Sequence, residues 1–309
     1  MKIADLSIIT LAALNERFGR PGYVAFEVSP RGGIVANLTS GESTAIVALH
    51  GAHVLSWMPA AGEPDVLWCS PRSRLGTAKP VRGGIPVCWP WFGPHPDASL
   101  ALPAHGLVRA VPWTVESVEV TAVAVSVTLA IRLDADQQAA VGGNVSAQVR
   151  ITVGCNLSVE LITTNQGHNS VTLTEALHTY FAVGDIEMVS ISGLDGRTYL
   201  DQLSGREEMQ SGPVTIDQET DRIYWDTRAS LLIEDRAAGR SIEVMAEGSA
   251  STVIWNPWLD KAVRLGDMPR EDYRVLLCTE TANIGPRNAV TVAPGGVHRM
   301  TCRIATTKS

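Results

Sequence analysis

The chain lacks paired cysteines, long hydrophobic runs and an excess of positive charge, and each absence narrows the class of protein. Its five cysteines are scattered over 309 residues without a Cys-x-x-Cys pair. This favours reduced thiols in a cytoplasmic protein over a disulfide framework. No stretch approaches the roughly 20 apolar residues of a membrane span. The net charge of −7 argues against nucleic acid or a membrane surface as partner, although a local pocket can still hold a small anion.

Helical periodicity is scarce after residue 20. The mildly apolar start of the chain is interrupted by Asp5 and is not followed by a small-residue cleavage site. We therefore expect a short amphipathic helix over about residues 4–18 rather than a signal peptide. Residues 123–133 alternate between apolar and polar side chains, as strands do. Residues 113–120 alternate with one slip between Val115 and Val118, which predicts a β-bulge.

The segments that read as strands recur about every ten residues, with Gly, Asn or Asp turns between them and no intervening helices. This spacing is typical of antiparallel sheets. The end of the chain, residues 289–305, reads as two strands joined by Pro294-Gly295-Gly296. No Pro- or Ser-rich linker and no internal repeat divides the chain. We therefore predict an all-β protein, a large β-sandwich, with one domain over residues 1–309.

A first polar cluster lies in the Gly- and Pro-rich segment 79–109, which holds Arg82, His95, His105 and Arg109 among tryptophans. Arginine offers a planar fork of donors that suits phosphate or carboxylate. The segment therefore indicates an anion-binding pocket. The alternative is a well-packed aromatic loop with surface arginines.

Two further clusters follow apolar runs. In "TLTEALHTYF", strand alternation places His178 on the face opposite Glu175. In "RVLLCTETANI", Glu280 shares a face with Leu276 and Cys278, so it is expected to be partly buried. Burial raises the pKa of an unpaired carboxyl, which suits a catalytic base. The alternatives are a structural histidine and a glutamate at a strand end that faces water.

A metal site is not expected. His50 and His53 are three residues apart, so on a strand they face opposite sides, and no Cys or carboxylate lies nearby at metal-ligand spacing. The sequence also contains no phosphate-binding loop, dinucleotide fingerprint or nucleophile elbow.

Taken together, the clusters resemble the aldose 1-epimerase family, in its glucose-6-phosphate 1-epimerase (hexose-6-phosphate mutarotase) branch. The matching motifs span about residues 45–305 in family order: "GAHVLSWMP", "LWCSPRSRLGTAKPVRGGIPVCWPWFGPHP", "LPAHGLVRAVPW", "EALHTYFAVGDI", "DRIYWDT", "VIWNPWLDKAVRLGDMPREDYRVLLCTETANI" and "VAPGGVHRMTCRI". One departure is "RLGDMPRED", which has Leu265 and Gly266 where a more polar segment is expected. The resemblance implies a galactose-mutarotase-like β-supersandwich of large antiparallel sheets.

The resemblance also implies the activity and the site. The implied enzyme interconverts the α and β anomers of an aldohexose 6-phosphate, most simply glucose 6-phosphate, without a metal or an organic cofactor. Its two proton-transferring residues match His178 and Glu280. The implied substrate-binding residues are His105, the phosphate-side Arg82 and Arg109, and an aspartate that matches Asp221, with Asp226 as the alternative.

These residue types fit the chemistry of opening a pyranose ring. A carboxylate can take the proton of the anomeric O1 while a protonated imidazole protonates ring O5, and the roles reverse on closure. Trp89 or Trp91 could stack on the sugar or serve packing alone. Two alternatives stay open: a mutarotase of free aldoses, against which the arginines count, and a non-catalytic sugar-phosphate binding protein, against which the intact His178 and Glu280 count. We expect a monomer whose partner is a small hexose phosphate.

Overall fold

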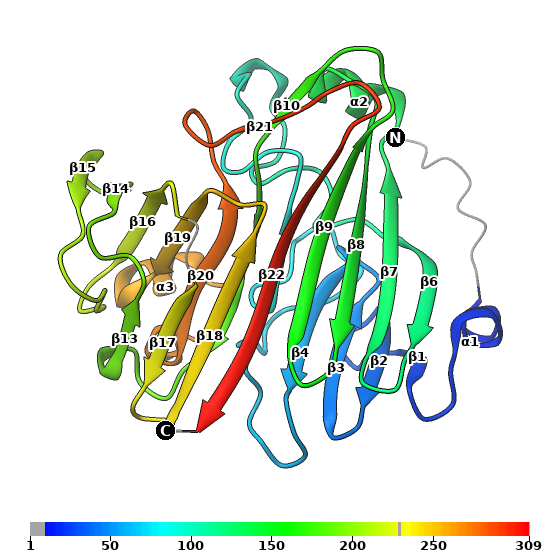
Figure 1. Cartoon of the computed structure of the whole chain (residues 1–309), viewed down its shortest axis with the longest axis horizontal. Helices are drawn as coiled ribbons and strands as arrows, with labels where there is room; N and C mark the ends of the chain where they lie inside the picture. The colour runs from blue at the N-terminus through cyan, green and yellow to red at the C-terminus, as the bar shows by residue number, and fades with distance from the viewer. Residues whose placement is uncertain (1–9, 228–229, 309) are drawn as a thin grey trace.

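The fold is built from antiparallel sheets, as predicted, in the computed structural model that describes residues 10–227 and 230–308. An eight-stranded sheet runs across the front of Figure 1 in the order β13-β17-β18-β22-β9-β8-β7-β6. Its strands are β13 (Val189–Ser192), β17 (Leu231–Asp235), β18 (Arg240–Glu247), β22 (Val297–Lys308), β9 (Leu157–Asn165), β8 (Val145–Val153), β7 (Val125–Arg132) and β6 (Thr114–Val120).

A second sheet of eight strands carries the residues discussed below. Its order is β15-β14-β16-β19-β20-β11-β5, and β12 also pairs with β20. The strands are β15 (Arg206–Met209), β14 (Thr198–Asp201), β16 (Thr220–Trp225), β19 (Ser251–Asn256), β20 (Leu276–Asn283), β11 (Glu175–Leu177), β5 (Val87–Cys88) and β12 (Tyr180–Ala182).

Two smaller sheets contain the other strands of the described residues. One contains β1 (Val24–Val28), β2 (Ile34–Ser40), β3 (Ser43–Ala48) and β4 (His53–Met58), and the other pairs β10 (Val171–Leu173) with β21 (Val290–Val292). Strands β2 and β3 pack against β7 and β8 behind the front sheet (Figure 1). Alternate residues of β8, such as Val149 and Ile151, are fully buried there. This burial of one face explains the period-2 pattern of the sequence.

The helices are short. Helix α1 (Leu11–Phe18) confirms a helix near the N-terminus, and Thr10 accepts the N-cap hydrogen bond from Ala13. The predicted helical residues 4–9 lie outside the described residues. Two further helices, α2 (Ala135–Val141) and α3 (Trp258–Leu265), were not predicted from the sequence. Three 3₁₀ turns are η1 (Ala98–Leu100), η2 (Ile186–Met188) and η3 (Arg270–Val275). Within the described part of the chain, no helix is long and apolar enough to cross a membrane.

Several local predictions can be compared with the strands. The register of β6 on β7 shifts between Val115 and Ser117, which confirms the bulge. The chain end forms β21 and β22 around the Pro-Gly-Gly turn, also as predicted. The strand-like run around His178 is instead divided into β10, β11 and β12, and His178 lies between the last two.

Gly106 allows the chain to cross Trp89 at very close range. Its φ is +84°, and a Cβ there would lie 2.0 Å from the carbonyl oxygen of Trp89. Gly205 also has a positive φ, +71°, but a Cβ there would meet nothing within 4 Å. We expect Gly106→Ala to lower the free energy of unfolding by about 1–3 kcal/mol more than Gly205→Ala, because both add φ strain but only Gly106→Ala adds a clash with packed backbone. Urea denaturation midpoints measure this difference, and equal losses would contradict it.

Candidate active site

One face of the second sheet gathers polar side chains from four neighbouring strands. Asp221 of β16 pairs with Trp255 of β19, Trp255 pairs with Cys278 of β20, and Cys278 pairs with Tyr180 of β12. Directly paired residues share a face, and so do residues two apart on one strand. Glu280 therefore lies on the same face as Cys278. This is the strand face that sequence analysis assigned to Glu280.

His178 and Glu280 form a buried pair. His178 Nε2 lies 3.2 Å from Glu280 Oε1, and the side chains are 12% and 1% exposed. Glu280 Oε2 and His178 Nδ1 are buried and have no hydrogen-bond partner among the described residues. A buried polar atom without a partner is costly and calls for an explanation, of which a catalytic role is one. The alternative of a glutamate that faces water is therefore wrong.

Burial favours the neutral form of both members of the pair. It lowers the pKa of His178 well below its ordinary value, and the charges of Arg109 and Arg82 lower it further. Burial raises the pKa of Glu280 well above its ordinary value, and Asp221 adds to this rise, whereas Arg109 opposes it. Both shifts therefore favour placing the proton of the pair on Glu280 over placing it on His178. This is the reverse of the distribution that the ring-opening step requires.

A cavity of about 350 Å³ opens in front of this pair. Its wall contains all six residues assigned from the sequence: Arg82, His105, Arg109, His178, Asp221 and Glu280. Phe92, Gly93, Pro94, Gln202, Val253, Trp255, Lys261 and Leu265 complete it. The segment around His105 and Arg109 is therefore part of a pocket and not only a packed loop. His95 does not line the cavity, because its ring nitrogens lie against the carbonyl oxygens of Asp97 and Ala140.

The backbone at His105 is unusual. His105 has a φ of +63°, a left-handed conformation that is strained for a residue with a side chain and recurs at functional sites. Its Nδ1 accepts a hydrogen bond from the N–H of Gly93 at 3.3 Å. Burial, then Arg109 and Arg82, lower the pKa of His105 to about 4. The ring is therefore neutral near pH 7, and Nε2 carries its proton as a hydrogen-bond donor.

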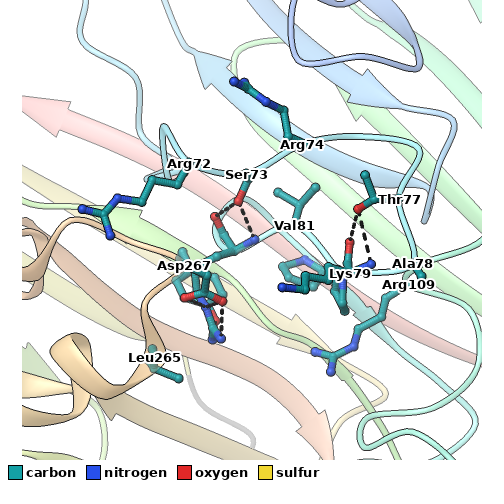
Figure 2. A pocket seen from close by; sticks show the side chains of 14 residues that line it. Arg72, Ser73, Arg74, Thr77, Ala78, Lys79, Val81, Arg109, Leu265 and Asp267 are labelled. Atoms are coloured by element: carbon teal, nitrogen blue, oxygen red, sulfur yellow. Dashed lines mark hydrogen bonds and ion pairs between the residues drawn. The ribbon is translucent and has the colours of Figure 1, made fainter.

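Arg82 and Arg109 line both this cavity and a second one of about 580 Å³ beside it. The second cavity is also lined by Arg72, Arg74 and Lys79, with Asp267 as its carboxylate (Figure 2). In this view Arg72 and Leu265 lie on one side of the cavity, and Lys79 and Arg109 lie on the other. The two arginines therefore stand at the boundary between a cavity with acid–base groups and a basic one.

The two arginines differ in their partners. Arg82 donates from Nε and Nη2 to Asp267 at 2.9–3.2 Å, and from Nη1 to the hydroxyl of Tyr180 at 3.1 Å. Arg109 donates to the carbonyl oxygen of Ala104 at 3.0 Å and forms no ion pair with any residue that the structure describes. Arg109 thus brings an uncompensated charge to the boundary, whereas Arg82 is held in one orientation.

The structure also separates the two candidate aspartates. Asp221 lies in the cavity wall, where Gln202 donates to it and Lys261 Nζ lies 3.5 Å away. Burial raises the pKa of Asp221, and Lys261 opposes that rise. Asp226 is exposed beyond the far end of β16 and bonds with Asn288. Of the two, only Asp221 is placed to contact a ligand in the cavity.

Several residues of the site are not among those predicted from the sequence. Asp267 lies in the segment "RLGDMPRED", which was noted only as a departure from the family pattern. Tyr180 lies two residues after His178, and its ring stacks on that of His178 with centroids 4.8 Å apart and an interplanar angle of 8°. The cavity tryptophan is Trp255, whereas Trp89 and Trp91 are buried elsewhere. The period-2 rule could have placed Tyr180 beside His178, but no local signal indicates Asp267 or Trp255.

The two histidines near β4 have other partners. His50 Nε2 lies 3.1 Å from the carbonyl oxygen of Thr77, and His53 Nε2 lies 2.7 Å from that of Gly83. Among residues 10–227 and 230–308, no three His, Cys, Asp or Glu side chains are grouped so that they could hold a metal ion.

Comparison with known proteins places this site in context. The sequence profile described as aldose 1-epimerase matches residues 35–305. A putative glucose-6-phosphate 1-epimerase of Escherichia coli is 37% identical over 246 residues, 79% of this chain and 81% of that protein. The crystal structure of a putative mutarotase from Salmonella typhimurium superposes with a TM-score of 0.84 at 30% identity and covers 93% of this chain and 94% of its own.

A more distant structure bears on the fold alone. A galactose mutarotase-like protein from Clostridium acetobutylicum superposes with a TM-score of 0.69 at 12% identity, covering 93% of this chain and 99% of its own. This likeness confirms the predicted galactose-mutarotase-like fold. From the match to residues 35–305 and the identity to its relatives, we conclude that the chain belongs to the aldose 1-epimerase family.

Proposed function

We propose that this epimerase interconverts the α and β anomers of an aldohexose 6-phosphate, with glucose 6-phosphate as the preferred substrate. The observation that carries the proposal is the shared cavity wall, in which the buried His178–Glu280 pair stands beside two arginines. The pair supplies proton transfer, and the arginines supply donors for a phosphate. Relatives named putative glucose-6-phosphate 1-epimerases support the phosphorylated substrate.

In the proposed reaction, Glu280 takes the proton of the anomeric O1 and His178 protonates ring O5 as the C1–O5 bond breaks. The open aldehyde turns about C1–C2 and recloses on its other face, with both proton transfers reversed. His105 donates a hydrogen bond to a sugar oxygen, and Asp221 accepts from sugar hydroxyls. Each positioned proton transfer contributes roughly 10²–10⁴-fold to the rate.

The phosphate is assigned to the boundary between the two cavities. Arginine has five N–H donors, and three of those of Arg82 are used by Asp267 and Tyr180. Two remain for a phosphate. Arg109 adds a positive charge with no carboxylate partner among the described residues. Because the acid–base pair lies in the same cavity, one hexose 6-phosphate can reach both.

Anomer exchange measured by NMR tests this function. We expect catalytic amounts of enzyme to speed exchange of glucose 6-phosphate far more than exchange of glucose or galactose, with a chelator present in all samples. Equal acceleration of free and phosphorylated sugars would favour the mutarotase of free aldoses. Saturable binding of glucose 6-phosphate without exchange would favour the non-catalytic binding protein.

The pair also predicts a bell-shaped pH profile of kcat/KM. The competent pair holds one proton in total. As pH falls, His178 is protonated below its lowered pKa while Glu280 keeps its proton; as pH rises, Glu280 loses its proton above its raised pKa. Activity is therefore lost at both ends, with apparent pKa values that belong to the pair. The phosphate monoester of the substrate itself titrates at about pH 6. The profile should therefore be measured on glucose as well, which has no phosphate. A rate that rises steadily with pH on both sugars would contradict this assignment.

A further inference from the structure

The surroundings of His178 are rich in groups that carry or can carry positive charge. The ring of His105 lies 6.0 Å from that of His178, between centroids, and Arg82 reaches the hydroxyl of Tyr180 that stacks on His178. The ionisable groups that face the pair from the surrounding elements are Arg82, His105, Arg109, Tyr180, Asp221, Lys261 and Cys278.

The two arginines act differently on the two members of the pair. Arg82 and Arg109 both lower the pKa of His178, and Arg109 also lowers that of Glu280. The effect of Arg109 therefore partly cancels within the pair. The charge of Arg82 opposes movement of the proton from Glu280 to His178. An anion bound beside Arg82 and Arg109 adds negative charge near His178 and so reduces this opposition.

Arg82 is also connected to His178 through direct contacts. Its Nη1 donates to the hydroxyl of Tyr180 at 3.1 Å, and the Tyr180 ring stacks on the imidazole with an interplanar angle of 8°. Burial raises the pKa of Tyr180, so the phenol stays neutral and adds no charge of its own. Asp267 fixes the other edge of the guanidinium. A ligand that binds Arg82 therefore binds to a group held against the ring that stacks on His178.

We propose that a phosphate dianion bound at Arg82 and Arg109 activates the His178–Glu280 pair, so that the substrate's phosphate promotes proton transfer as well as binding. When the dianion binds, the O–H bond at Glu280 breaks and an N–H bond forms at His178, and the pair keeps one proton and zero net charge. The resulting carboxylate and imidazolium are the base and acid that ring opening needs. This inference rests on the proposed function and names the regulation of the same site.

The inference can be tested by supplying the sugar and the phosphate group as two separate molecules. Phosphite dianion is added while anomer exchange is measured on glucose, and on xylose, which lacks the sixth carbon and leaves more room at the boundary. We expect saturable activation of about tenfold or more, because a relative change of one pKa unit within the pair alters the population of the active form tenfold. Sodium chloride at equal ionic strength should not activate. Phosphite should inhibit turnover of glucose 6-phosphate, because it competes for the same arginines.

Variants assign the activation to the boundary. Arg82→Gln and Arg109→Gln should abolish activation by phosphite, whereas Arg109→Lys, which keeps the charge, should retain part of it. Arg132→Gln is the matched control, since Arg132 is exposed at the end of β7, outside both cavities, and should keep full activation. Two results overturn the inference. The first is activation by phosphite that survives both glutamine variants. The second is no activation of the wild type, although glucose 6-phosphate still turns over much faster than glucose. The second result leaves the proposed function intact, whereas equal turnover of the two sugars defeats the proposed function itself.

Discussion

Glu280→Gln and His178→Asn are each expected to lower the rate of anomer exchange on glucose 6-phosphate by about 10²-fold or more. Gln nearly keeps the volume of Glu280 and Asn keeps a polar group in place of the imidazole, but neither amide can take or give the proton. Because the pair acts as a unit, the double variant should lose little more than either single variant. Substrate affinity should change much less than kcat, since the arginines remain. Steady-state kinetics on the folded proteins measure both quantities.

The chain offers a close control for these variants. Glu175 and His298 form a second His–Glu pair, with 2.8 Å between His298 Nε2 and Glu175 Oε1, and the side chain of Glu175 is fully buried. Glu175 also accepts from Asn283, and neither Glu175 nor His298 lines the two cavities at Arg82. Glu175→Gln should therefore lower stability but leave kcat per folded molecule near that of the wild type. If Glu175→Gln reduced kcat as much as Glu280→Gln does, the loss of any buried carboxylate would explain the effect, and Glu280 would have no specific role.

Arg82→Ala and Arg109→Ala are expected to lower kcat/KM on glucose 6-phosphate by about 10–150-fold each. A hydrogen bond to a charged group contributes about 1.5–3 kcal/mol, and each 1.4 kcal/mol corresponds to about tenfold. Part of the loss should appear in kcat, because remote binding energy also orients the reacting ring. Lysine should restore only part of the activity, since it supplies charge without the planar fork.

Free glucose separates recognition of phosphate from folding. The arginine variants should show no comparable loss on glucose, which has no phosphate to bind. Equal losses on the two sugars would make both arginines structural residues and would remove the physical basis of the preference for a phosphorylated substrate. Circular dichroism and thermal unfolding of each variant exclude a trivial loss of the fold.

The strands and the chemical groups could be predicted from sequence because both depend on local patterns. Alternation identified β6, with its bulge, and β7, and the face shared by Cys278 and Glu280 followed from the same rule. The short helix α2 also had a local signal that was missed. Asp134 and Gln137 form a capping box, and Gly142 ends the helix in the left-handed conformation.

The remaining features depend on long-range contacts. Asp267 forms an ion pair with Arg82, which lies 185 residues earlier in the sequence. The two residues meet only because of the register of the sheets and the position at which α3 ends. Trp255 lines the cavity because β19 lies beside β20. The shifted pKa values of the pair depend on such contacts as well, because the sequence indicates partial burial of Glu280 but not the arginines and the second histidine around His178.

Exchange NMR on glucose 6-phosphate at chemical equilibrium tests the central claim most directly, because it detects interconversion of the anomers without any coupled enzyme. With a chelator present, we predict fast exchange with the wild type and with Glu175→Gln, and exchange slower by about 10²-fold or more with Glu280→Gln. Exchange at the uncatalysed rate with folded wild-type protein, or full activity of folded Glu280→Gln, would contradict the account.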